Sequence, residues 1–365
     1  MEEQKRTYVP YTQWKEPSIQ REYTQETPLL SDDGKLLAKG WARRNVFTYD
    51  RDKVRRKGMS RKEWDFYQIS DGKCVLQMNF ANVTLFSYIS CKFVDLRTGE
   101  VWVDTMDMAL PSRRKHISPP KGDVPNLIRD KIGPTGFEFD TRETFRTLKL
   151  DSTHKKLPLS CEIAMDIPEG LENITTVLPF DEDETRYFMT TKQNCMPCSG
   201  TFTYGDRSYT FSKEDSFATL DWGRVNSIHE MVWYWGNGAT YLTDGEGKKH
   251  LFGFEITWAI GNEHHATETA LFYDGKVHKF GAVDVEVFPK PDKYMEPWHF
   301  VSEDGRFDMT MVPTFDHKSL SDVGIAQMNT HQVHGLWSGK AVLDDGTVLE
   351  IKDMYAFCEY VENKW

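Results

Sequence analysis

The stretch from Phe217 to Gly275 reads FATLDWGRVNSIHEMVWYWGNGATYLTDGEGKKHLFGFEITWAIGNEHHATETALFYDG. It brings acids, histidines, tryptophans and glycines closer together than any other segment of the chain. Large aromatic side chains form the walls of small-molecule pockets, and carboxylates or imidazoles transfer protons. We therefore expect the functional site in this stretch. The alternative is that its tryptophans belong to the core and its charges lie on solvated strand faces, which is the commoner situation for each residue taken singly.

Short segments of alternating apolar and polar residues flank this stretch. Lys73–Asn79, Phe145–Asp151 and Arg306–Val312 alternate with period two, and turns of glycine, aspartate and proline separate such segments. A period of two is typical of half-buried strands. No run of helical spacing is long enough for a βαβ unit, so the sequence predicts an antiparallel all-β fold. No G-x-G-x-x-G or Walker loop follows a strand, and nucleotide binding is not expected.

The length of 365 residues exceeds one ordinary core and suits two domains. Prolines and polar residues in 1–30 predict an extended surface arm. An acidic, turn-rich segment before residue 196 suggests a boundary between two barrels, at 31–195 and 196–365. A faint repeat supports two similar halves, because Trp64–Tyr67 and Trp233–Trp235 each precede an aromatic segment that ends in a glycine turn. Two tandem barrels would also leave no exposed sheet edge.

The net charge of -11 argues against a nucleic-acid partner, because phosphate binding needs clustered lysine and arginine. The one strongly basic run, Arg51–Arg61, is short and fits a solvated loop or a local anion contact. No apolar N-terminal region resembles a secretion signal, and no apolar run reaches the roughly 18 residues of a membrane helix. We therefore expect a soluble cytoplasmic protein whose partner is a small molecule.

The six cysteines are scattered, and without a secretion signal we interpret them as reduced thiols. Cys195-Met196-Pro197-Cys198 has C-x-x-C spacing, but no second pair follows for a zinc site and no βαβ unit surrounds it for a redox motif. We interpret it as a plain loop. His331 and His334 have H-x-x-H spacing without a third ligand. The sequence therefore predicts neither a metal nor another cofactor.

Asp221 is the first candidate for proton transfer. It is adjacent to Trp222, and a carboxyl against an indole in a cavity loses solvation, which raises its pKa and keeps a proton available near neutral pH. A general acid that protonates an alkene or an enol needs this property. The alternative is an ion pair of Asp221 with Arg224 that closes a loop.

Glu268 is the second candidate. His264, Ala266 and Glu268 share one face if their segment is a strand, so Glu268 could be a second acid or base that His264 tunes. The alternative is that this face is solvated. His229 lies before Trp233 and Trp235, and an imidazole beside aromatic walls can carry protons at neutral pH. A lone histidine there is still more often a hydrogen-bonded structural group.

Several segments resemble those of a known family: Gly40–Arg44 with Tyr49-Asp50-Arg51, Arg61–Tyr67, Leu220–Arg224, Thr267–His278, Pro297-Trp298, and Gly335–Gly339 with Asp344-Asp345-Gly346. They resemble a bacterial family of unknown function related to lipocalin-like double-barrel proteins, among them the carotenoid hydratases (hydroxyneurosporene synthases) and the attachment-protein-H group. The resemblance implies two consecutive lipocalin-like antiparallel β-barrels with a cavity suited to an apolar or polycyclic molecule. Some of these relatives add water to an alkene or promote cyclisation, with a carboxylic acid as proton donor.

Two departures from the family pattern lie in the expected site. Val225-Asn226-Ser227 follows Arg224 where relatives more often have a glycine and an aromatic–proline step. Thr269 stands where asparagine is commoner. Both departures leave the substrate and the activity open.

These observations together predict a cofactor-independent acid–base enzyme of the hydratase, lyase, isomerase or cyclase type. The expected catalytic residues are Asp221, Glu268, His229 and Arg224. The expected pocket residues are Trp222, Trp233, Trp235, His264, Trp298 and His299, whose indoles would stabilise developing positive charge. One alternative is a lipocalin-like carrier with an apolar cavity. Another is a glycan-active enzyme with paired carboxylates, Asp221 and Glu268.

Overall fold

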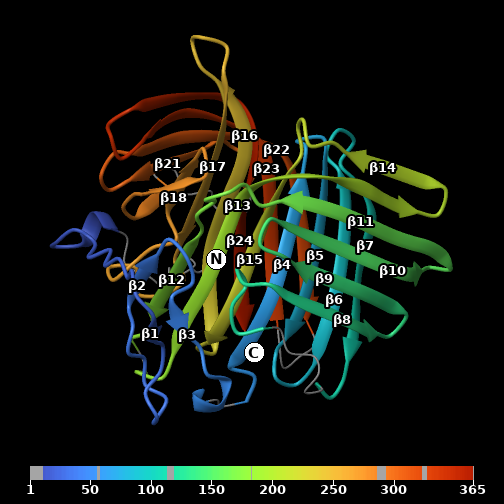
Figure 1. Cartoon of the computed structure of the whole chain (residues 1–365), viewed down its shortest axis with the longest axis horizontal. Helices are drawn as coiled ribbons and strands as arrows, with labels where there is room; N and C mark the ends of the chain where they lie inside the picture. Colours follow the sequence, from blue (N-terminus) through green and yellow to red (C-terminus); the bar gives the residue numbers. More distant parts are fainter. Residues whose placement is uncertain are drawn as a thin grey trace.

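The computed structural model describes residues 11–55, 58–112, 119–181, 183–285, 293–322 and 327–364. They form two large curled β-sheets, each approaching a barrel (Figure 1). The prediction of an all-β fold with two tandem barrels is confirmed. In the described ranges the helical elements are two 3-10 turns, η1 (Tyr11–Gln13) and η2 (Arg51–Lys53). Residues 1–10 of the predicted arm, and Arg56 and Lys57 of the basic run, lie outside the described residues.

The first sheet contains strands from both sides of the predicted boundary. Its main path runs, in order, through β7 (Glu100–Ala109), β6 (Ser87–Asp95), β5 (Cys74–Asn82), β4 (Arg61–Ser70), β15 (Phe217–Asn226), β13 (Tyr187–Tyr204), β11 (Leu157–Asp166), β10 (Phe145–His154), β9 (Thr135–Thr141) and β8 (Asn126–Ile132). Three shorter strands attach to β13 directly or in series: β12 (Ile174–Pro179), β14 (Arg207–Phe211) and β2 (Gly40–Ala42). A separate parallel pair joins β1 (Thr27–Pro28) and β3 (Phe47–Thr48).

The second sheet is an antiparallel array of long central strands with short strands at its ends. Its order is β19 (Lys276–Lys279), β18 (Ala270–Tyr273), β17 (Lys249–Trp258), β16 (Glu230–Thr243), β24 (Val348–Lys364), β23 (Gln327–Val342), β22 (Phe307–Asp322), β21 (Trp298–Ser302) and β20 (Val283–Val285).

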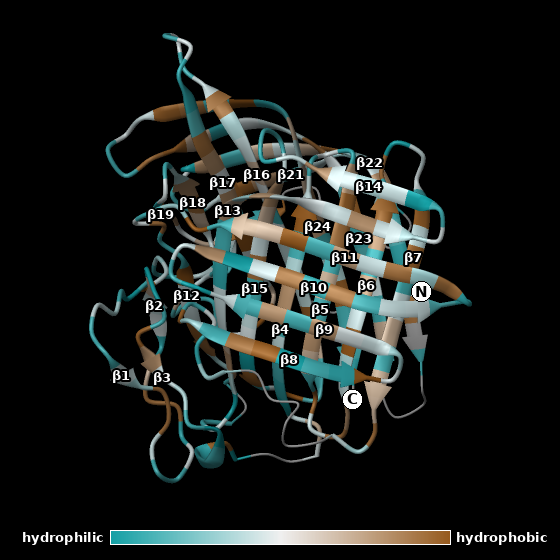
Figure 2. Ribbon diagram, turned by 45° about the vertical axis from the view of Figure 1, so that its right-hand side comes forward, coloured by the Kyte–Doolittle hydropathy of each residue, from teal (hydrophilic) through white to brown (hydrophobic). Residues whose placement is uncertain are grey.

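Each sheet curls around its own hydrophobic core. The alternation of apolar and polar residues is visible along the strands of the first sheet (Figure 2), and it places one face inward. Phe80, Phe137 and Trp222 lie in the first core, and Trp258 and Trp337 lie in the second. Many of the large aromatic side chains therefore belong to these two cores.

The change of sheet lies later in the chain than the predicted boundary at 195/196. Strand β13 runs continuously through this position, and the first sheet ends with Asn226 of β15, whereas the second begins at Glu230. Asp181, Asp183 and Glu184 of the acidic segment that suggested a boundary lie in the connection between β12 and β13, which pair as a hairpin. An acidic turn marks the end of a strand and does not show whether the next strand returns to the same sheet.

The C-x-x-C segment lies within β13, so its interpretation as a loop was wrong. Cys195 has a φ of 61°, and the pairing of β13 with β15 shifts register between Gln193 and Met196. Such a bulge bends a strand and explains the turn-like composition. All six cysteines are buried free thiols, and burial raises the pKa of Cys195 and of Cys198.

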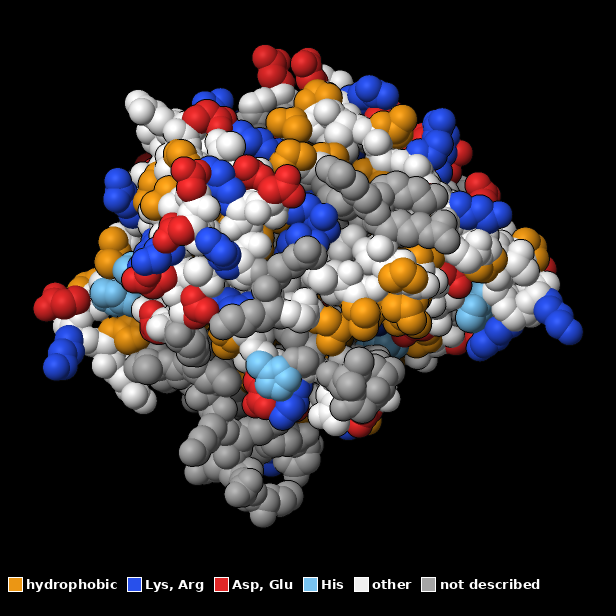
Figure 3. Space-filling view, turned by 90° about the horizontal axis from the view of Figure 1, so that it is seen from below, with side chains coloured by type: hydrophobic (Ala, Val, Ile, Leu, Met, Phe, Trp, Pro, Cys, Tyr) orange, Lys and Arg blue, Asp and Glu red, His pale blue; other side chains and the backbone are white. Residues whose placement is uncertain are grey.

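The surface seen from below carries both signs of charge. Lysine and arginine side chains are interspersed with acids over its described part (Figure 3). This mixture gives no extended basic surface among the described residues of this face. Within the described ranges, no helix is long and apolar enough to span a membrane.

The two sheets pack against each other through their outer faces, with β13 against β16 and β17. Gly253 of β17 marks a close approach, because a Cβ atom there would lie 2.4 Å from Cys195 Sγ and 2.8 Å from the carbonyl oxygen of Gly238. Only a residue without a side chain fits between the sheets at this point. The contact fixes how β13 lies on the second sheet.

We expect Gly253→Ala to lower the free energy of unfolding by about 1–3 kcal/mol, because an inserted methyl group must displace β13 or the backbone of β16. Urea unfolding followed by tryptophan fluorescence measures the effect. Gly245→Ala is the matched control, since a Cβ atom added at Gly245 would have no neighbour within 4 Å, and it should change stability by less than about 0.5 kcal/mol. Equal stability of the two variants would contradict the close approach of the sheets.

Candidate functional site

A buried lysine lies at the centre of the space between the two sheets. Lys192 of β13 is paired in register with Asp221 of β15. Directly opposed residues in a sheet share a face, and this face is the one turned toward the second sheet. Lys192 Nζ lies 2.9 Å from Asp221 Oδ1 and 3.9 Å from Glu268 Oε2. The side chains of Lys192, Asp221 and Glu268 are 3%, 12% and 1% exposed. The fold therefore brings the two predicted acids to one ammonium group.

The environment of Glu268 allows proton exchange near neutral pH. Burial raises the pKa of Glu268 to about 7, although the charge of Lys192 opposes the rise. The hydroxyl of Thr257 also favours the ionised form of Glu268, but this effect is smaller than that of burial. Burial lowers the pKa of Lys192, but the neighbouring carboxylates outweigh that effect and the net shift is upward. Lys192 therefore stays charged while Glu268 gains or loses a proton.

Trp235 and Glu255 form one wall of this site. Trp235 of β16 donates from Nε1 to Glu255 Oε2 of β17 at 2.7 Å, and Lys192 Nζ lies 4.1 Å from the indole centroid. Asn194 Nδ2 donates to the other oxygen of Glu255 at 3.1 Å. Burial raises the pKa of Glu255 well above its ordinary value. The indole thus lies between the ammonium group and a carboxyl that is held by two neutral donors.

Trp233 and Glu359 repeat this arrangement one step along β16. Trp233 Nε1 donates to Glu359 Oε1 of β24 at 2.9 Å, and Gln332 Nε2 of β23 donates to Oε2 at 3.1 Å. Burial raises the pKa of Glu359 as well. Trp233 and Trp235 are two residues apart in a strand, so both face the first sheet. The expected tryptophan walls are present here, outside both barrels.

The segment that carries Glu268 is not the strand that its alternation suggested. Strand β18 begins at Ala270, and residues 263–265 form a turn in which Ile260 N donates to Glu263 Oε1 at 3.4 Å. His264 packs edge-on against Trp14 of the arm, with ring centroids 5.4 Å apart. The prediction that His264 shares a strand face with Glu268 was therefore wrong. The carboxylate of Glu263 binds its own turn, and this local pairing overrides the period-two pattern.

Trp222 and Arg224 point into the first barrel, away from Asp221. Consecutive strand residues face opposite sides, so the Trp222 indole does not pack on the Asp221 carboxyl. Arg224 lies over the Trp222 ring at 4.1 Å and 3.7 Å from Asp65 Oδ1, and it donates to the carbonyl oxygen of Trp64. The alternative ion pair of Asp221 with Arg224 is therefore not formed. Arg224 and Trp222 belong to the interior of the first barrel.

The remaining predicted residues also lie apart from the lysine site. His229 is exposed in the connection between the two sheets. Trp298 is buried in the core of the second barrel, where its Nε1 donates to the carbonyl oxygen of Tyr294 at 3.0 Å. His299 points outward and pairs with Asp308 at 2.7 Å. The structure thus unites Asp221, Glu268, Trp233 and Trp235, and separates the other six residues from them.

Sequence reasoning missed Lys192, Glu255 and Glu359. Each is a single charged residue within an otherwise uncharged strand segment, as in Phe254-Glu255-Ile256 and Cys358-Glu359-Tyr360. A charge is rarely buried unless it is paired, so this pattern is a usable signal for a buried polar cluster. His331 and His334 bind different partners, Asp316 at 2.7 Å and Tyr355 at 2.8 Å. Within the described residues, no group of three or more histidines, cysteines and acids is placed to hold a metal ion.

Comparisons with known proteins agree with the resemblance read from the sequence. Residues 20–365 match the family described as "Domain of unknown function (DUF2804)", and the chain belongs to this family. No curated protein matches the sequence. Kievitone hydratase from Nectria haematococca has a similar structure, with a TM-score of 0.48 and 11% identity over 83% of this chain and 88% of that chain. A protein of Nitrosomonas europaea provisionally named AttH has a TM-score of 0.47 and 9% identity over 82% and 91%.

Proposed function

We propose that this member of the DUF2804 family is a cofactor-independent acid–base enzyme. It adds water to, or removes water from, a carbon–carbon double bond of an apolar small molecule. The reaction takes place between the two sheets, at Lys192, Asp221 and Glu268. The observation that carries the proposal is the Glu268 carboxyl, which is 1% exposed and has a pKa raised by burial to about 7.

A purely structural ion pair does not account for this arrangement. Lys192 is already paired with Asp221 at 2.9 Å, so Glu268 is a surplus carboxyl in a buried place. A buried carboxyl costs stability unless it is protonated or paired. Groups whose pKa is moved toward the working pH cluster at catalytic sites, because a general acid is most effective when its pKa lies near that pH. The surplus carboxyl is therefore explained by proton transfer.

The proposed hydration step is balanced within the site. Protonated Glu268 gives its proton to one alkene carbon, and the other carbon becomes electron-deficient next to the indoles of Trp233 and Trp235. A water molecule forms a bond from its oxygen to that carbon and releases a proton to the Asp221 carboxylate. The product is an alcohol, and the proton returns from Asp221 to Glu268 through solvent. Elimination of water follows the same path in reverse.

Neither alternative fits the described site as well. A carrier of the lipocalin type would hold its ligand inside a barrel, whereas the buried acids described here lie between the two barrels. A glycosidase keeps the gap between its two carboxyls open for the glycosidic bond. Here Lys192 Nζ approaches both carboxylates, at 2.9 Å and 3.9 Å, and lies in that gap.

The test is mass spectrometry of small molecules that co-purify with wild type, with Asp221→Asn and with the control Asp308→Asn, whose carboxylate is 59% exposed. We expect a ligand that accumulates on Asp221→Asn alone and that wild type converts to a product differing by one water. In D₂O the product should carry one deuterium on carbon. An intact ligand retained equally by all three proteins would show a carrier and refute the proposal.

A further inference from the structure

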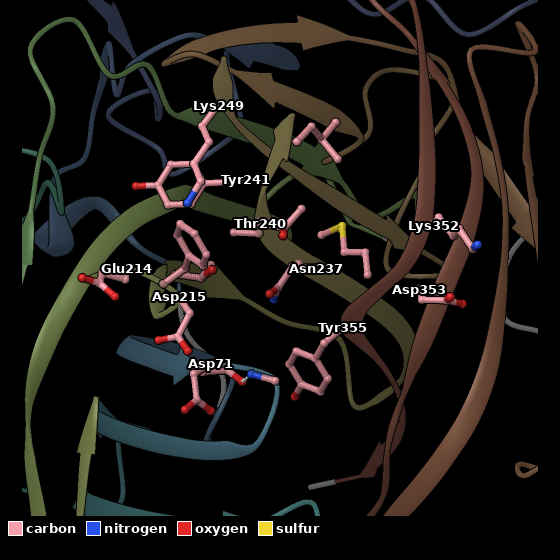
Figure 4. A pocket seen from close by; sticks show the side chains of 18 of the residues that line it. Asp71, Glu214, Asp215, Asn237, Thr240, Tyr241, Lys249, Lys352, Asp353 and Tyr355 are labelled. Atoms are coloured by element: carbon pink, nitrogen blue, oxygen red, sulfur yellow. Dashed lines mark hydrogen bonds between the residues drawn. The ribbon is translucent and has the colours of Figure 1, made fainter. Parts of the chain in front are cut away.

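A cleft of about 410 Å³ opens between the two sheets, beside the buried lysine site. It is lined by the end of β4, the start of β15 and neighbouring turns of the first sheet, and by β16, β17 and β24 of the second (Figure 4). Thr219 of β15 and Asn237 of β16 line it from the two sheets. They lie two residues from Asp221 and from Trp235, on the same strand faces. The cleft and the lysine site are therefore neighbours in one inter-sheet layer.

The buried lining of the cleft offers an unused hydrogen-bond donor. Asn237 is 2% exposed, and its Nδ2 has no acceptor among the described residues. Asn237 lies near the middle of the lining side chains in Figure 4. A buried donor without a partner costs about 1–3 kcal/mol, and native structures leave few such groups unexplained. The amide is satisfied if a ligand presents an oxygen acceptor to it.

The rim carries charges of both signs with an excess of acids. The charged residues of the rim are Asp71, Glu214, Asp215, Asp353, Lys249 and Lys352. Lys352 and Asp353 lie on the side of the cleft opposite to Asp71 (Figure 4). Lys73 pairs with Asp215 at 2.9 Å, and Lys249 Nζ lies 5.6 Å from the centroid of the Tyr241 ring, so the remaining carboxylates of the rim still outnumber its lysines. The acids oppose an anionic ligand, and the lysines on two sides oppose a cationic one. A neutral ligand with many hydroxyl groups can bond to both.

Aromatic rings flank this polar lining. The partly buried ring of Tyr241 meets Phe217 edge-on, with centroids 5.1 Å apart, and Tyr355 lies across the cleft. Flat aromatic faces pack against the C–H faces of sugar rings, while amides, hydroxyls and carboxylates bond to the sugar hydroxyls. We propose that the cleft is a binding site for a neutral sugar or a sugar-like polyol, with Asn237 as a hydrogen-bond donor and Tyr241 as a stacking surface.

Hydrogen bonds would connect a ligand in the cleft to the lysine site. Thr219 Oγ1 donates to Asn194 Oδ1 at 2.9 Å, and Asn194 Nδ2 donates to Glu255 at 3.1 Å. Glu255 also accepts from Trp235, on which Lys192 lies. Binding of a sugar does not depend on acid–base chemistry at Glu268, so the two proposals are tested separately.

The test is saturation-transfer NMR and calorimetric titration with methyl glycosides of glucose, galactose, mannose and xylose, and with sorbitol. Glucose 6-phosphate and glucosamine are the charged comparisons. We expect at least one neutral probe to bind with a Kd on the order of 1 mM. Its affinity should fall roughly 10-fold in Tyr241→Ala and roughly 5-fold in Asn237→Ala.

Tyr273→Ala is the matched control, because Tyr273 is a partly buried tyrosine of β18 that does not line the cleft. It should bind the neutral probe with unchanged affinity. Three results would each overturn the proposal: no transfer to any neutral probe, equal affinity in wild type and in Tyr241→Ala, or tighter binding of a charged probe. The Tyr241 variant changes a partly exposed ring, so the test stands even if Asn237→Ala fails to fold.

Discussion

Replacing Lys192 with methionine is expected to lower the free energy of unfolding by roughly 3–5 kcal/mol at pH 8. Methionine keeps most of the side-chain volume but removes the ammonium group that lies 2.9 Å from Asp221 and 3.9 Å from Glu268. Both carboxylates then remain buried without a counter-charge, which costs more than the ion pair contributed. Urea unfolding of the variant and of wild type measures the difference.

The pH dependence of this loss identifies its cause. When the pH falls, the stranded carboxyls take up protons and their burial costs less. The difference between Lys192→Met and wild type should therefore shrink on acidification from pH 8 to pH 5. Adding Asp221→Asn to Lys192→Met should recover part of the stability, because it removes one of the two stranded charges.

Lys92 provides the matched control for this experiment. It also lies between the sheets, with Nζ 3.4 Å from Gln332 Oε1 and 3.7 Å from Asp104 Oδ2. Burial lowers the pKa of Lys92, and Asp104 is 47% exposed and can be hydrated. Lys92→Met should cost about 1 kcal/mol or less. If Lys92→Met lowered the free energy of unfolding as much as Lys192→Met, any lysine between the sheets would contribute equally to stability. Lys192 would then have no special role.

The sequence predicted the class of fold and two of the acids, but not the group that unites them. Alternation along single strands is a local property, so it was sufficient for the all-β prediction. The pairing of Lys192 with Asp221 depends on the register of β13 against β15, which no local pattern specifies. Lys192 also lies just before the bulge at Cys195, where the composition resembled a loop.

The strand face on which each side chain lies could partly be predicted from the sequence, and for Asp221 and Trp222 the prediction was wrong. The period of two already places Asp221 and Trp222 on opposite faces, so their adjacency in sequence argued against contact. What the sequence does not show is that both faces of β15 are buried, one in the first barrel and one against the second sheet. Thr219 and Asp221 are polar residues of the face toward the second sheet, whereas Arg224 is a polar residue of the face toward the first barrel.

A polar layer between two barrels has a physical advantage for chemistry. A barrel interior is filled by side chains of its own sheet, and removing them to make a cavity costs core stability. Between two sheets, the side chains of Lys192, Glu255 and Glu359 come from strands whose other faces still hold intact cores. The site therefore has rigid strands on both sides without interrupting either hydrophobic core.

Glu268→Gln is expected to make the protein more stable above pH 7 while abolishing the proposed reaction. Burial raises the pKa of Glu268 to about 7 from an ordinary value of 4.5. Between these values the folded state binds more protons than the unfolded state, so the stability of wild type falls as the pH rises. A shift of this size corresponds to roughly 3 kcal/mol. Glutamine resembles the protonated carboxyl at every pH and avoids this loss.

Urea unfolding of wild type and Glu268→Gln at pH 5, 6, 7 and 8 tests this reasoning. The two proteins should be similar at pH 5, and the variant should gain up to roughly 3 kcal/mol by pH 8. Glu350→Gln is the control, because Glu350 is 70% exposed, and its difference from wild type should stay small and independent of pH. A variant that is less stable at pH 8 would mean that ionised Glu268 stabilises the fold through Lys192. Glu268 would then be a structural anion, and the proposed proton donor would have to be sought elsewhere in the inter-sheet layer.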